Sequence, residues 1–198
     1  QLFMKQLIKE VVANYAVDGI QGDDRLPAMP AEGGYDSYTS QLYLLETGNL
    51  PPAECREKNW LQWKANQLNA FGKSIYQLVK KQRATCLVTW SPSVYPWSKE
   101  QYLQDWPTWV KEGYADYILP QLYRYDIKAY EKVLLQLKSQ VTPSQMNKIF
   151  PGILTSLGDG YLVNQQFLQE MIQLNRKHGF KGECWFYYES LNKIPSIY

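Results

Sequence analysis

The apolar positions of this chain follow two patterns that alternate along its length. Stretches in which apolar residues recur every three to four positions are typical of amphipathic helices, and short continuous apolar runs are typical of buried strands. Helices are therefore expected at about 1–15, 59–83, 98–113, 126–140 and 164–179. Strands are expected at about 16–21, 85–90, 115–122, 149–154 and 182–188.

Short polar side chains indicate where several of these helices begin. Two pairs have the spacing of a capping box, in which each side chain bonds to the backbone N–H of the other residue: Asn59 with Gln62, and Ser98 with Gln101. Asp126 and Asn164 are further N-cap candidates. Residues 22–56 are expected to be loop, because proline and glycine interrupt them repeatedly.

At 198 residues, the chain is expected to form a single domain with a sizeable core. Roughly five strands that alternate with long helices predict right-handed βαβ units and a parallel sheet, which is the α/β class. Two architectures fit this order: a five-stranded, doubly wound open sheet, and part of a (β/α)8 TIM barrel. A whole barrel typically takes about 250 residues, so this chain would cover about five βα units of an incomplete barrel.

The predicted strands end in side chains that could carry chemistry. The first is followed by Asp23, Asp24 and Arg25, the second by Trp90, Ser91, Ser93, Tyr95 and Trp97, the third by Gln121, Tyr123, Arg124 and Tyr125, and the last by Trp185, Tyr187, Tyr188 and Glu189. In a parallel sheet these ends lie along one rim. Carboxylates beside aromatic rings suit glycoside cleavage, which uses one carboxyl group as acid and another as nucleophile or base.

The carboxylates differ in how well their positions fit catalysis. Asp23 and Asp24 follow a buried strand directly and precede a long loop, which favours a functional role; the alternative is a solvated turn or a helix N-cap. Glu189 lies at the same end of its strand and is our first choice as partner for Asp23; the alternative is a helix-initiating residue. Asp116 and Glu183 stand near strand starts, away from the rim, and are expected to be structural.

Composition and charge exclude several other functions. Interspersed charges with a net value of +2 do not call for nucleic acid or an anionic membrane, and no apolar run approaches the roughly 20 residues of a membrane helix. The single histidine, His178, is expected in the last turn of a helix, and Cys55, Cys86 and Cys184 lack metal-site spacing. No metal and no other cofactor is therefore implied. Aromatic residues, at 15%, exceed what a core of this size requires, and their flat rings suit sugar faces.

Four segments at the predicted strand ends carry a family resemblance. They are Tyr15–Arg25 (YAVDGIQGDDR), Ser91–Trp97 (SPSVYPW), Gly113–Tyr123 (GYADYILPQLY) and Gly182–Glu189 (GECWFYYE). In sequence and order they resemble the glycosyl hydrolase-like 10 family. The resemblance implies a (β/α)8 barrel that acts on bacterial cell-wall glycan freed of its peptides, with this chain spanning about the fourth to the eighth strand. It also implies an extracytoplasmic location, in the periplasm or cell envelope.

The resemblance also implies roles for individual residues. The pattern from Asp18 to Asp23, Asp-Gly-x-x-x-Asp, is similar to the fourth strand of several retaining glycosidase families, in which the last aspartate is the nucleophile. Carried over to this chain, that aspartate is Asp23, which would be nucleophile or stabiliser. The resemblance does not fix the acid, for which Asp24 and Glu189 are the candidates. In this interpretation Arg25, Gln121 and Tyr123 hold sugar hydroxyls, Trp90, Trp97 and Trp185 stack on sugar faces, and Tyr95 and Tyr187 complete the substrate-binding set.

Two alternatives to a glycoside hydrolase remain open: a non-catalytic glycan-binding module on the same scaffold, and an open α/β domain with an unrelated regulatory role. The first three strands of the family's barrel are absent from this sequence. We therefore expect either that the chain is an excerpt of a longer protein or that a partner or second copy supplies those strands. The chain starts at Gln1 inside a predicted helix, so a segment upstream, a leader included, is expected.

Overall fold

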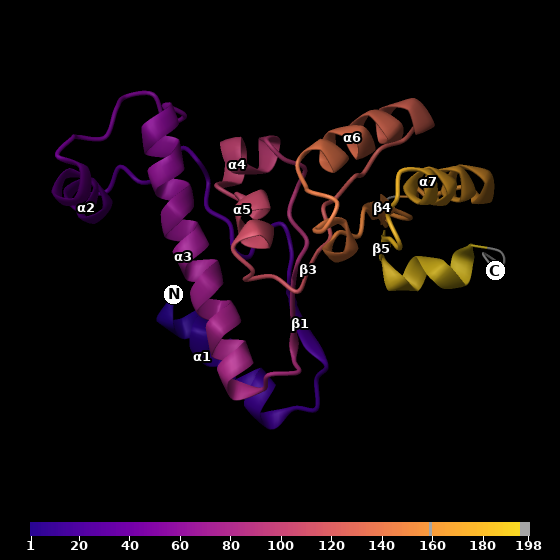
Figure 1. Ribbon diagram of the computed structural model, residues 1–198, viewed down its shortest axis with the longest axis horizontal. Coiled ribbons are helices and arrows are strands. Elements are labelled where there is room, and N and C mark those ends of the chain that lie inside the picture. The colour runs from indigo at the N-terminus through magenta and orange to yellow at the C-terminus, as the bar shows by residue number, and fades with distance from the viewer. Residues whose placement is uncertain (159, 195–198) are drawn as a thin grey trace.

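A computed structural model of the chain describes residues 1–158 and 160–194 (Figure 1). The strands in this part are β1 (Gly19–Gly22), β2 (Leu87–Trp90), β3 (Tyr117–Ile118), β4 (Gly152–Leu154) and β5 (Cys184–Phe186). The helices are α1 (Leu2–Asn14), α2 (Ser37–Thr47), α3 (Lys58–Gln82), α4 (Trp97–Tyr102), α5 (Trp106–Lys111), α6 (Ile127–Ser139) and α7 (Gln165–Lys177), with 3-10 turns η1 (Met146–Lys148) and η2 (Tyr188–Lys193). The expected alternation of strand and helix is confirmed, although the strands are shorter than predicted.

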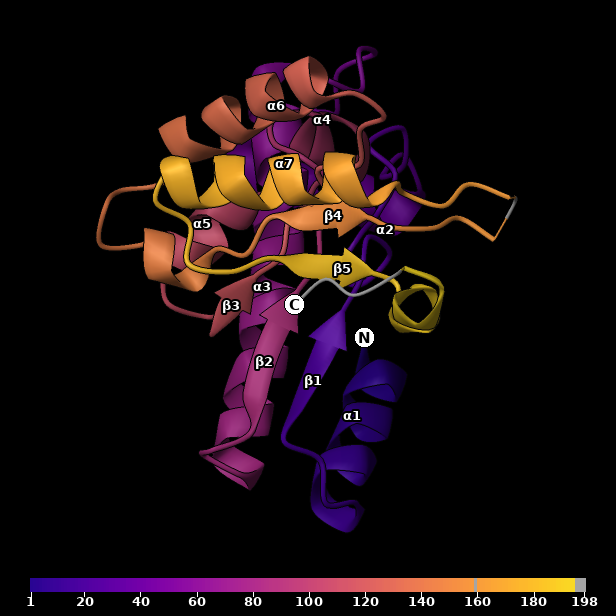
Figure 2. The same ribbon diagram turned by 90° about the vertical axis from the view of Figure 1, so that its right-hand side faces the viewer.

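All five strands are parallel and follow one another in chain order. β1, β2 and β3 form one sheet and β4 and β5 a second, and parallel bridges at Ile118–Ile149 and Gln121–Gly152 join the two. A doubly wound sheet reverses its strand order at a switch point, so this order is that of a barrel arc. Figure 2 shows β4 and β5 turned well away from the direction of β1 and β2. In the described residues β1 and β5 each pair on one side only, so the barrel is not closed.

One face of the sheet packs against helices and the other is open. On β2, Val88 and Trp90 are almost fully buried against the core that includes Ile75 of α3, whereas Leu87 is 38% exposed. This alternation follows from the two-residue period of a strand. Figure 1 shows α1, α3 and α5 together on the covered side of β1 and β3. None of the helices described by the structure is long and apolar enough to span a membrane.

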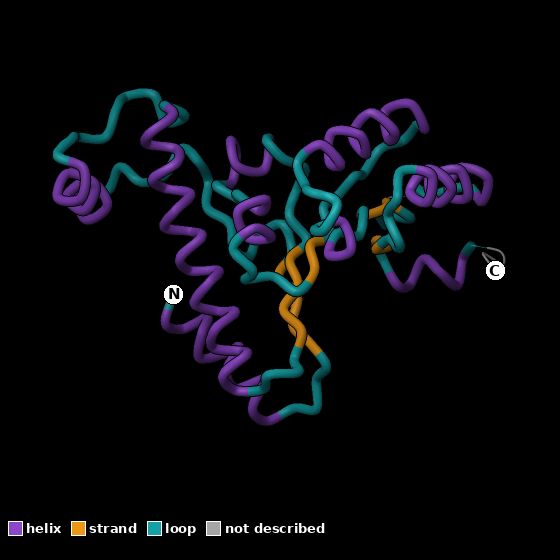
Figure 3. The backbone as a smooth tube through the Cα atoms, viewed as in Figure 1, coloured by secondary structure: helices purple, strands orange, loops and turns teal. Residues whose placement is uncertain are grey.

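The segment between β1 and α3 contains a helix where we expected only loop. The carboxylate of Asp36 accepts a hydrogen bond from the Thr39 backbone N–H at 3.0 Å, which caps the start of α2. α2 ends at Gly48, whose φ of 74° is a left-handed conformation that glycine adopts without strain. Figure 3 shows loop on both sides of α2, so residues 23–57 form an excursion from the sheet rather than an unstructured connection.

Two of the four predicted helix caps are confirmed. The side chain of Asp126 accepts from the Ala129 N–H, and that of Asn164 accepts from the Phe167 N–H, both at 2.8 Å. The two predicted capping boxes are wrong. Glu57 caps α3 by accepting from the backbone N–H groups of the second and third helical residues, so the helix starts one residue before Asn59.

The predicted helix at 98–113 is divided into α4 and α5. The chain turns at Leu103, which has a left-handed φ of 61°. Ser98 lies inside α4, fully buried, and its hydroxyl donates to the main-chain oxygen of Gln104 at 3.0 Å instead of capping a helix. The loop between α4 and α5 is therefore directed into the interior of the protein.

Candidate functional site

A pocket lies at the carboxyl ends of β2 and β3, where the sequence predicted a site. It has a volume of ≈ 450 Å³ and is lined by Ser93, Val94, Tyr95, Pro96, Trp97, Gln121, Tyr123, Arg124 and Gln136. That volume falls within the roughly 300–1,000 Å³ of small-molecule sites. Four of the predicted substrate-binding residues meet here: Tyr95, Trp97, Gln121 and Tyr123. We call this hollow the rim pocket.

Gln121 fixes the two loops that form the rim pocket. Its side-chain Nε2 donates to the main-chain oxygen of Ser91 at 3.0 Å, and its backbone N–H donates to that of Pro92 at 2.9 Å. Gln121 thereby holds the segment after β3 against the segment after β2. Trp97, at the edge of the pocket, is 45% exposed and has Tyr102 edge-on to its ring at 5.3 Å between centroids. It therefore has free ring surface for a ligand.

Tyr123 connects the rim pocket to β5 and to the loop after β1. Its ring lies 5.5 Å from that of Phe186 between centroids. Burial raises the pKa of the Tyr123 hydroxyl, with smaller contributions in the same direction from Cys184 and from the carboxylate of Asp24. Asp24 is thus close enough to act on this hydroxyl electrostatically. The phenol stays protonated at neutral pH and is a hydrogen-bond donor.

The two adjacent aspartates after β1 have different surroundings. Asp23 is exposed, and its Oδ1 accepts the backbone N–H of Arg25 at 2.8 Å. This is the turn contact that we considered as the structural alternative, and it fixes the orientation of the carboxylate. Asp24 is half-buried, whereas the Arg25 side chain is exposed. The loop therefore directs one carboxylate to solvent and brings the other near Tyr123.

A residue that the sequence analysis missed holds this loop in place. Gln104 is fully buried, and its Nε2 donates to the main-chain oxygens of Asp24 and Pro27, both at 3.3 Å. Its Oε1 accepts from the backbone N–H of Ser93 at 3.4 Å. One amide thus links the loop after β1 to the loop after β2. Its neighbours in the sequence are Leu103 and Asp105, so no local pattern marks it.

One of the tryptophans predicted to stack on sugars belongs to the core. Trp90 is 1% exposed, lies edge-on to Trp109 at 5.9 Å and donates its indole N–H to the Tyr114 main-chain oxygen at 3.3 Å. Its ring has no free face, so the stacking role predicted for Trp90 is corrected to a packing role. Trp185 is half-buried and packs against the same core.

A model of one protein family covers most of the chain. A model of the family described as "Glycosyl hydrolase-like 10" matches residues 1–159. This chain belongs to the glycosyl hydrolase-like 10 family. The matched residues include the motifs after β1, β2 and β3, which form the rim pocket and the aspartate loop. The fourth motif, Gly182–Glu189, lies beyond the match.

Solved structures extend the likeness to almost the whole chain. The PgaB (BpsB) glycoside hydrolase domain from Bordetella bronchiseptica superimposes with a TM-score of 0.78 at 14% identity, over 98% of this chain and 58% of that one. Bee venom hyaluronidase, in complex with a hyaluronic acid tetramer, gives a TM-score of 0.50 at 14% identity, over 93% of this chain and 65% of that one. The likeness shows a parallel α/β fold similar to that of glycoside hydrolase domains. No curated protein sequence matches the chain.

This member of the glycosyl hydrolase-like 10 family spans 58% of the Bordetella domain. The remaining predicted catalytic acid, Glu189, lies at one edge of the sheet. Glu189 follows β5 in the first turn of η2; its side chain is 67% exposed and lies 3.9 Å from Lys193. It therefore lies at the sheet edge opposite to β1 and Asp23. The ring of Tyr187, also beyond β5, is 5.4 Å from that of Phe186.

The residues expected to be structural have structural contacts. Asp116 accepts the backbone N–H of Val88 and pairs with Lys80, both at 2.7 Å. Glu183 pairs with Arg176 at 2.8 Å, and His178 is the C-cap of α7, as predicted. The three cysteines are free thiols. Within 1–158 and 160–194, no group of three or more histidine, cysteine or acidic residues is arranged to bind a metal ion.

Proposed function

We propose that this chain hydrolyses glycosidic bonds in a bacterial glycan that resembles peptidoglycan strands freed of peptides. The observation that supports this most directly is the rim pocket, which gathers aromatic rings and hydrogen-bonding groups beside the Asp24 carboxylate. Family membership supports the reaction class, since a fold alone does not define an activity. We further propose that the chain is the portion of a (β/α)8 barrel from about its fourth to its eighth strand.

The proposed reaction uses two carboxyl groups on opposite sides of the scissile bond. Asp23 acts as nucleophile or stabilises the oxocarbenium-like transition state, and Asp24 or Glu189 protonates the leaving oxygen. Of these two, Asp24 is half-buried and lies close to Tyr123, which lines the rim pocket with its proposed sugar contacts. Glu189 remains the candidate at the other sheet edge.

The rim pocket supplies the proposed sugar contacts. The Tyr123 hydroxyl donates to a sugar oxygen, Trp97 stacks on a pyranose face, and Gln121 holds a hydroxyl while fixing the loops. Tyr95, Arg25, Tyr187 and Trp185 complete the proposed set. The same substrate class implies an extracytoplasmic location, in the periplasm or cell envelope. Because β1 and β5 are open edges, we also propose that a preceding barrel portion or a second copy completes the set of strands.

The test measures reducing ends released from purified glycan strands by the wild type and by Asp23→Asn, Asp24→Asn and Glu189→Gln. We expect Asp23→Asn and one of the other two to lose turnover while glycan binding is retained. The matched control is Glu10→Gln, an exposed acid on α1. If turnover by all three variants equals that of the control, these carboxylates have no part in catalysis.

A second candidate function is glycan binding without hydrolysis. It is favoured by the contacts of two of the acids, since Asp23 is engaged with the Arg25 backbone and Glu189 is exposed beside Lys193. It predicts saturable binding of glycan strands with no release of reducing ends. Trp97→Ala would then weaken binding, whereas the three carboxamide variants would have smaller effects.

A further inference from the structure

The excursion between β1 and α3 is rigidly built although it extends far from the sheet (Figure 1). Tyr43 of α2 is 5% exposed and packs edge-on against Trp60 at 4.6 Å. The ammonium group of Lys64, also 5% exposed, donates to the main-chain oxygens of Ala31, Gly33 and Cys55. Such a buried and fully bonded lysine fixes the loop against α3, so the surface of the excursion is preorganised.

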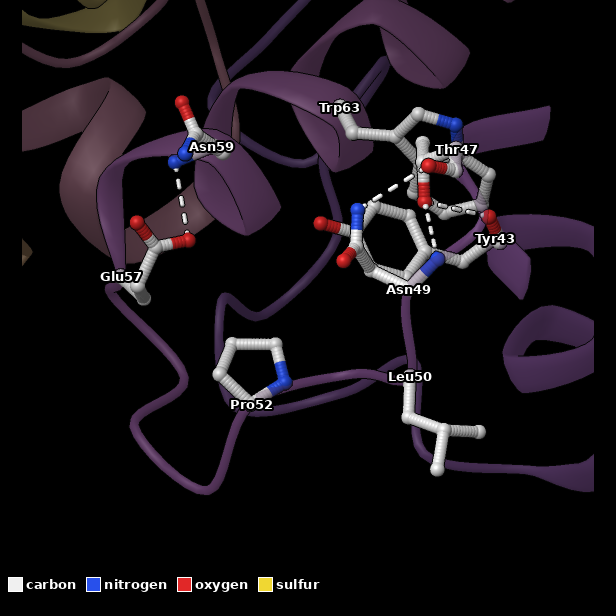
Figure 4. Close-up of a pocket in the computed structure, with 8 residues that line it drawn as sticks. All are labelled: Tyr43, Thr47, Asn49, Leu50, Pro52, Glu57, Asn59 and Trp63. Carbon is white, nitrogen blue, oxygen red and sulfur yellow. Dashed lines mark hydrogen bonds between the residues drawn. The ribbon is translucent and has the colours of Figure 1, made fainter.

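This excursion contains a pocket of ≈ 380 Å³, which we call the α2 pocket. Its lining residues are Tyr43, Thr47, Asn49, Leu50, Pro52, Glu57, Asn59 and Trp63. Figure 4 shows Glu57 and Asn59 on one side of the hollow, with Trp63 and Asn49 across from them. It is distinct from the rim pocket, because none of its lining residues is shared with that site.

Trp63 has the features of a fixed ligand platform. Its ring stacks on Trp60, with centroids 5.2 Å apart and an angle of 12° between the planes, and its Nε1 donates to Glu46 at 2.7 Å. Both contacts fix the indole plane. Trp63 also lines a second hollow of ≈ 560 Å³, together with Tyr38 and Leu42. Two hollows that meet at one held indole fit a ligand built of several linked rings.

The polar groups of the α2 pocket define the charge of that ligand. The lining residues include amides, hydroxyls and one carboxylate, and no lysine or arginine. Hydrogen bonds from the Trp60 and Asn59 backbone N–H groups lower the pKa of Glu57, so this residue is negatively charged at neutral pH. A carboxylate in a lining that contains no lysine or arginine disfavours phosphates and acidic sugars. Amides beside an aromatic ring suit neutral sugar hydroxyls and acetamido groups.

We propose that the α2 pocket is a second glycan-binding site, which holds a neutral hexopyranose unit of a glycan chain. This inference rests on the proposed function for the class of ligand. The excursion begins at Asp23, at the same rim as the proposed catalytic groups. The site would hold a distal part of a long chain, outside the rim pocket.

The experiment measures binding, so that it does not depend on hydrolysis. The probe is a hexamer of β-1,4-linked N-acetylglucosamine, titrated by calorimetry into the wild type, Trp63→Ala and Asn59→Ala. We expect Trp63→Ala to weaken binding by about tenfold or more, and Asn59→Ala by about threefold, because the side chain of Asn59 is exposed at the pocket. A hexamer of galacturonic acid, in which every sugar is acidic, is expected to bind at least about tenfold more weakly than the neutral hexamer.

Two controls separate this proposal from loss of folding and from failure of the proposed activity. Asn14→Ala, at an exposed asparagine that ends α1, is expected to bind like the wild type. If Trp63→Ala melts well below the wild type, Trp63→Phe and Asn59→Ala decide the result. Wild-type affinity in the variants, or no binding of the neutral hexamer, would overturn the proposal. Binding without any hydrolysis would overturn only the proposed enzymatic function.

Discussion

The side chain of Gln104 lies under the aspartate loop, with its Nε2 3.3 Å from the main-chain oxygen of Asp24. The same amide accepts from the backbone N–H of Ser93, beside the rim pocket. Because Gln104 is fully buried, these polar groups depend on one another for hydrogen bonds. The position of the proposed catalytic loop relative to the sugar contacts is thus determined by a residue that bonds to the backbone of both loops and does not line the rim pocket.

Gln104→Leu should therefore lower both stability and activity. The substitution keeps the volume but leaves the oxygens of Asp24 and Pro27 and the N–H of Ser93 without their partner, at a cost of about 1–3 kcal/mol for a buried unsatisfied group. Urea denaturation measures the stability loss. Because Gln104 positions the loop with Asp23 and Asp24, Gln104→Leu should lower kcat by a larger factor than it changes KM.

The matched control for Gln104 is Gln173→Leu, at an exposed position of α7. It should change the free energy of unfolding by less than about 0.5 kcal/mol. Equal stability and equal kinetics in both variants would mean that the loop after β1 is held by other contacts.

The two tryptophans on the β2 side of the rim should respond to alanine in opposite ways. Trp90 is 1% exposed in the core, so Trp90→Ala should lower the free energy of unfolding by about 3–5 kcal/mol. Trp97 is 45% exposed, so Trp97→Ala should leave the melting temperature nearly unchanged and weaken glycan binding. Thermal melts and glycan titrations of the same two variants test both statements. A large drop in melting temperature for Trp97→Ala would make this residue structural.

Much of the fold could be predicted from the sequence, because the strands and most helices are defined by burial on one face. Asp126 and Asn164 were identified as caps because an N-cap depends on contacts within three residues. α2 was missed because its apolar residues do not form one buried face: Tyr43 is buried, whereas Leu44 and Leu45 are 41% and 83% exposed. The pattern that marks other helices is therefore absent from this one.

The site was predictable only as far as the topology of parallel strands brings residues together. Tyr95, Trp97, Gln121 and Tyr123 meet in one pocket because the ends of neighbouring strands share an edge. The roles of Trp90 and Trp97 could be separated only by the position of each residue: Trp90 is two residues from buried Val88 on the same face of β2, whereas Trp97 lies beyond the strand. No local pattern identifies Gln104, since its partners are far away in sequence.

The last prediction concerns alkaline pH. Burial raises the pKa of the Tyr114 hydroxyl to about 12, with smaller contributions from Glu112 and Asp105, whereas an unfolded tyrosine titrates near about 10. The folded state therefore holds this proton more tightly than the unfolded state. The stabilisation is fully present below about pH 10 and is lost as the pH rises toward about 12, because the unfolded chain releases the proton first.

Urea denaturation between pH 8 and pH 11 measures this slope for the wild type and for Tyr114→Phe. Phenylalanine keeps the ring in the core and has no proton to release, so the variant should lose less stability over this range. Tyr15→Phe, at a 58% exposed tyrosine, is the matched control and should have the slope of the wild type. Burial raises the pKa of Tyr123 and Tyr130 too, so Tyr114→Phe should reduce the alkaline slope without abolishing it. Identical slopes for Tyr114→Phe and Tyr15→Phe would mean that the Tyr114 hydroxyl is as well solvated in the folded chain as in the unfolded one.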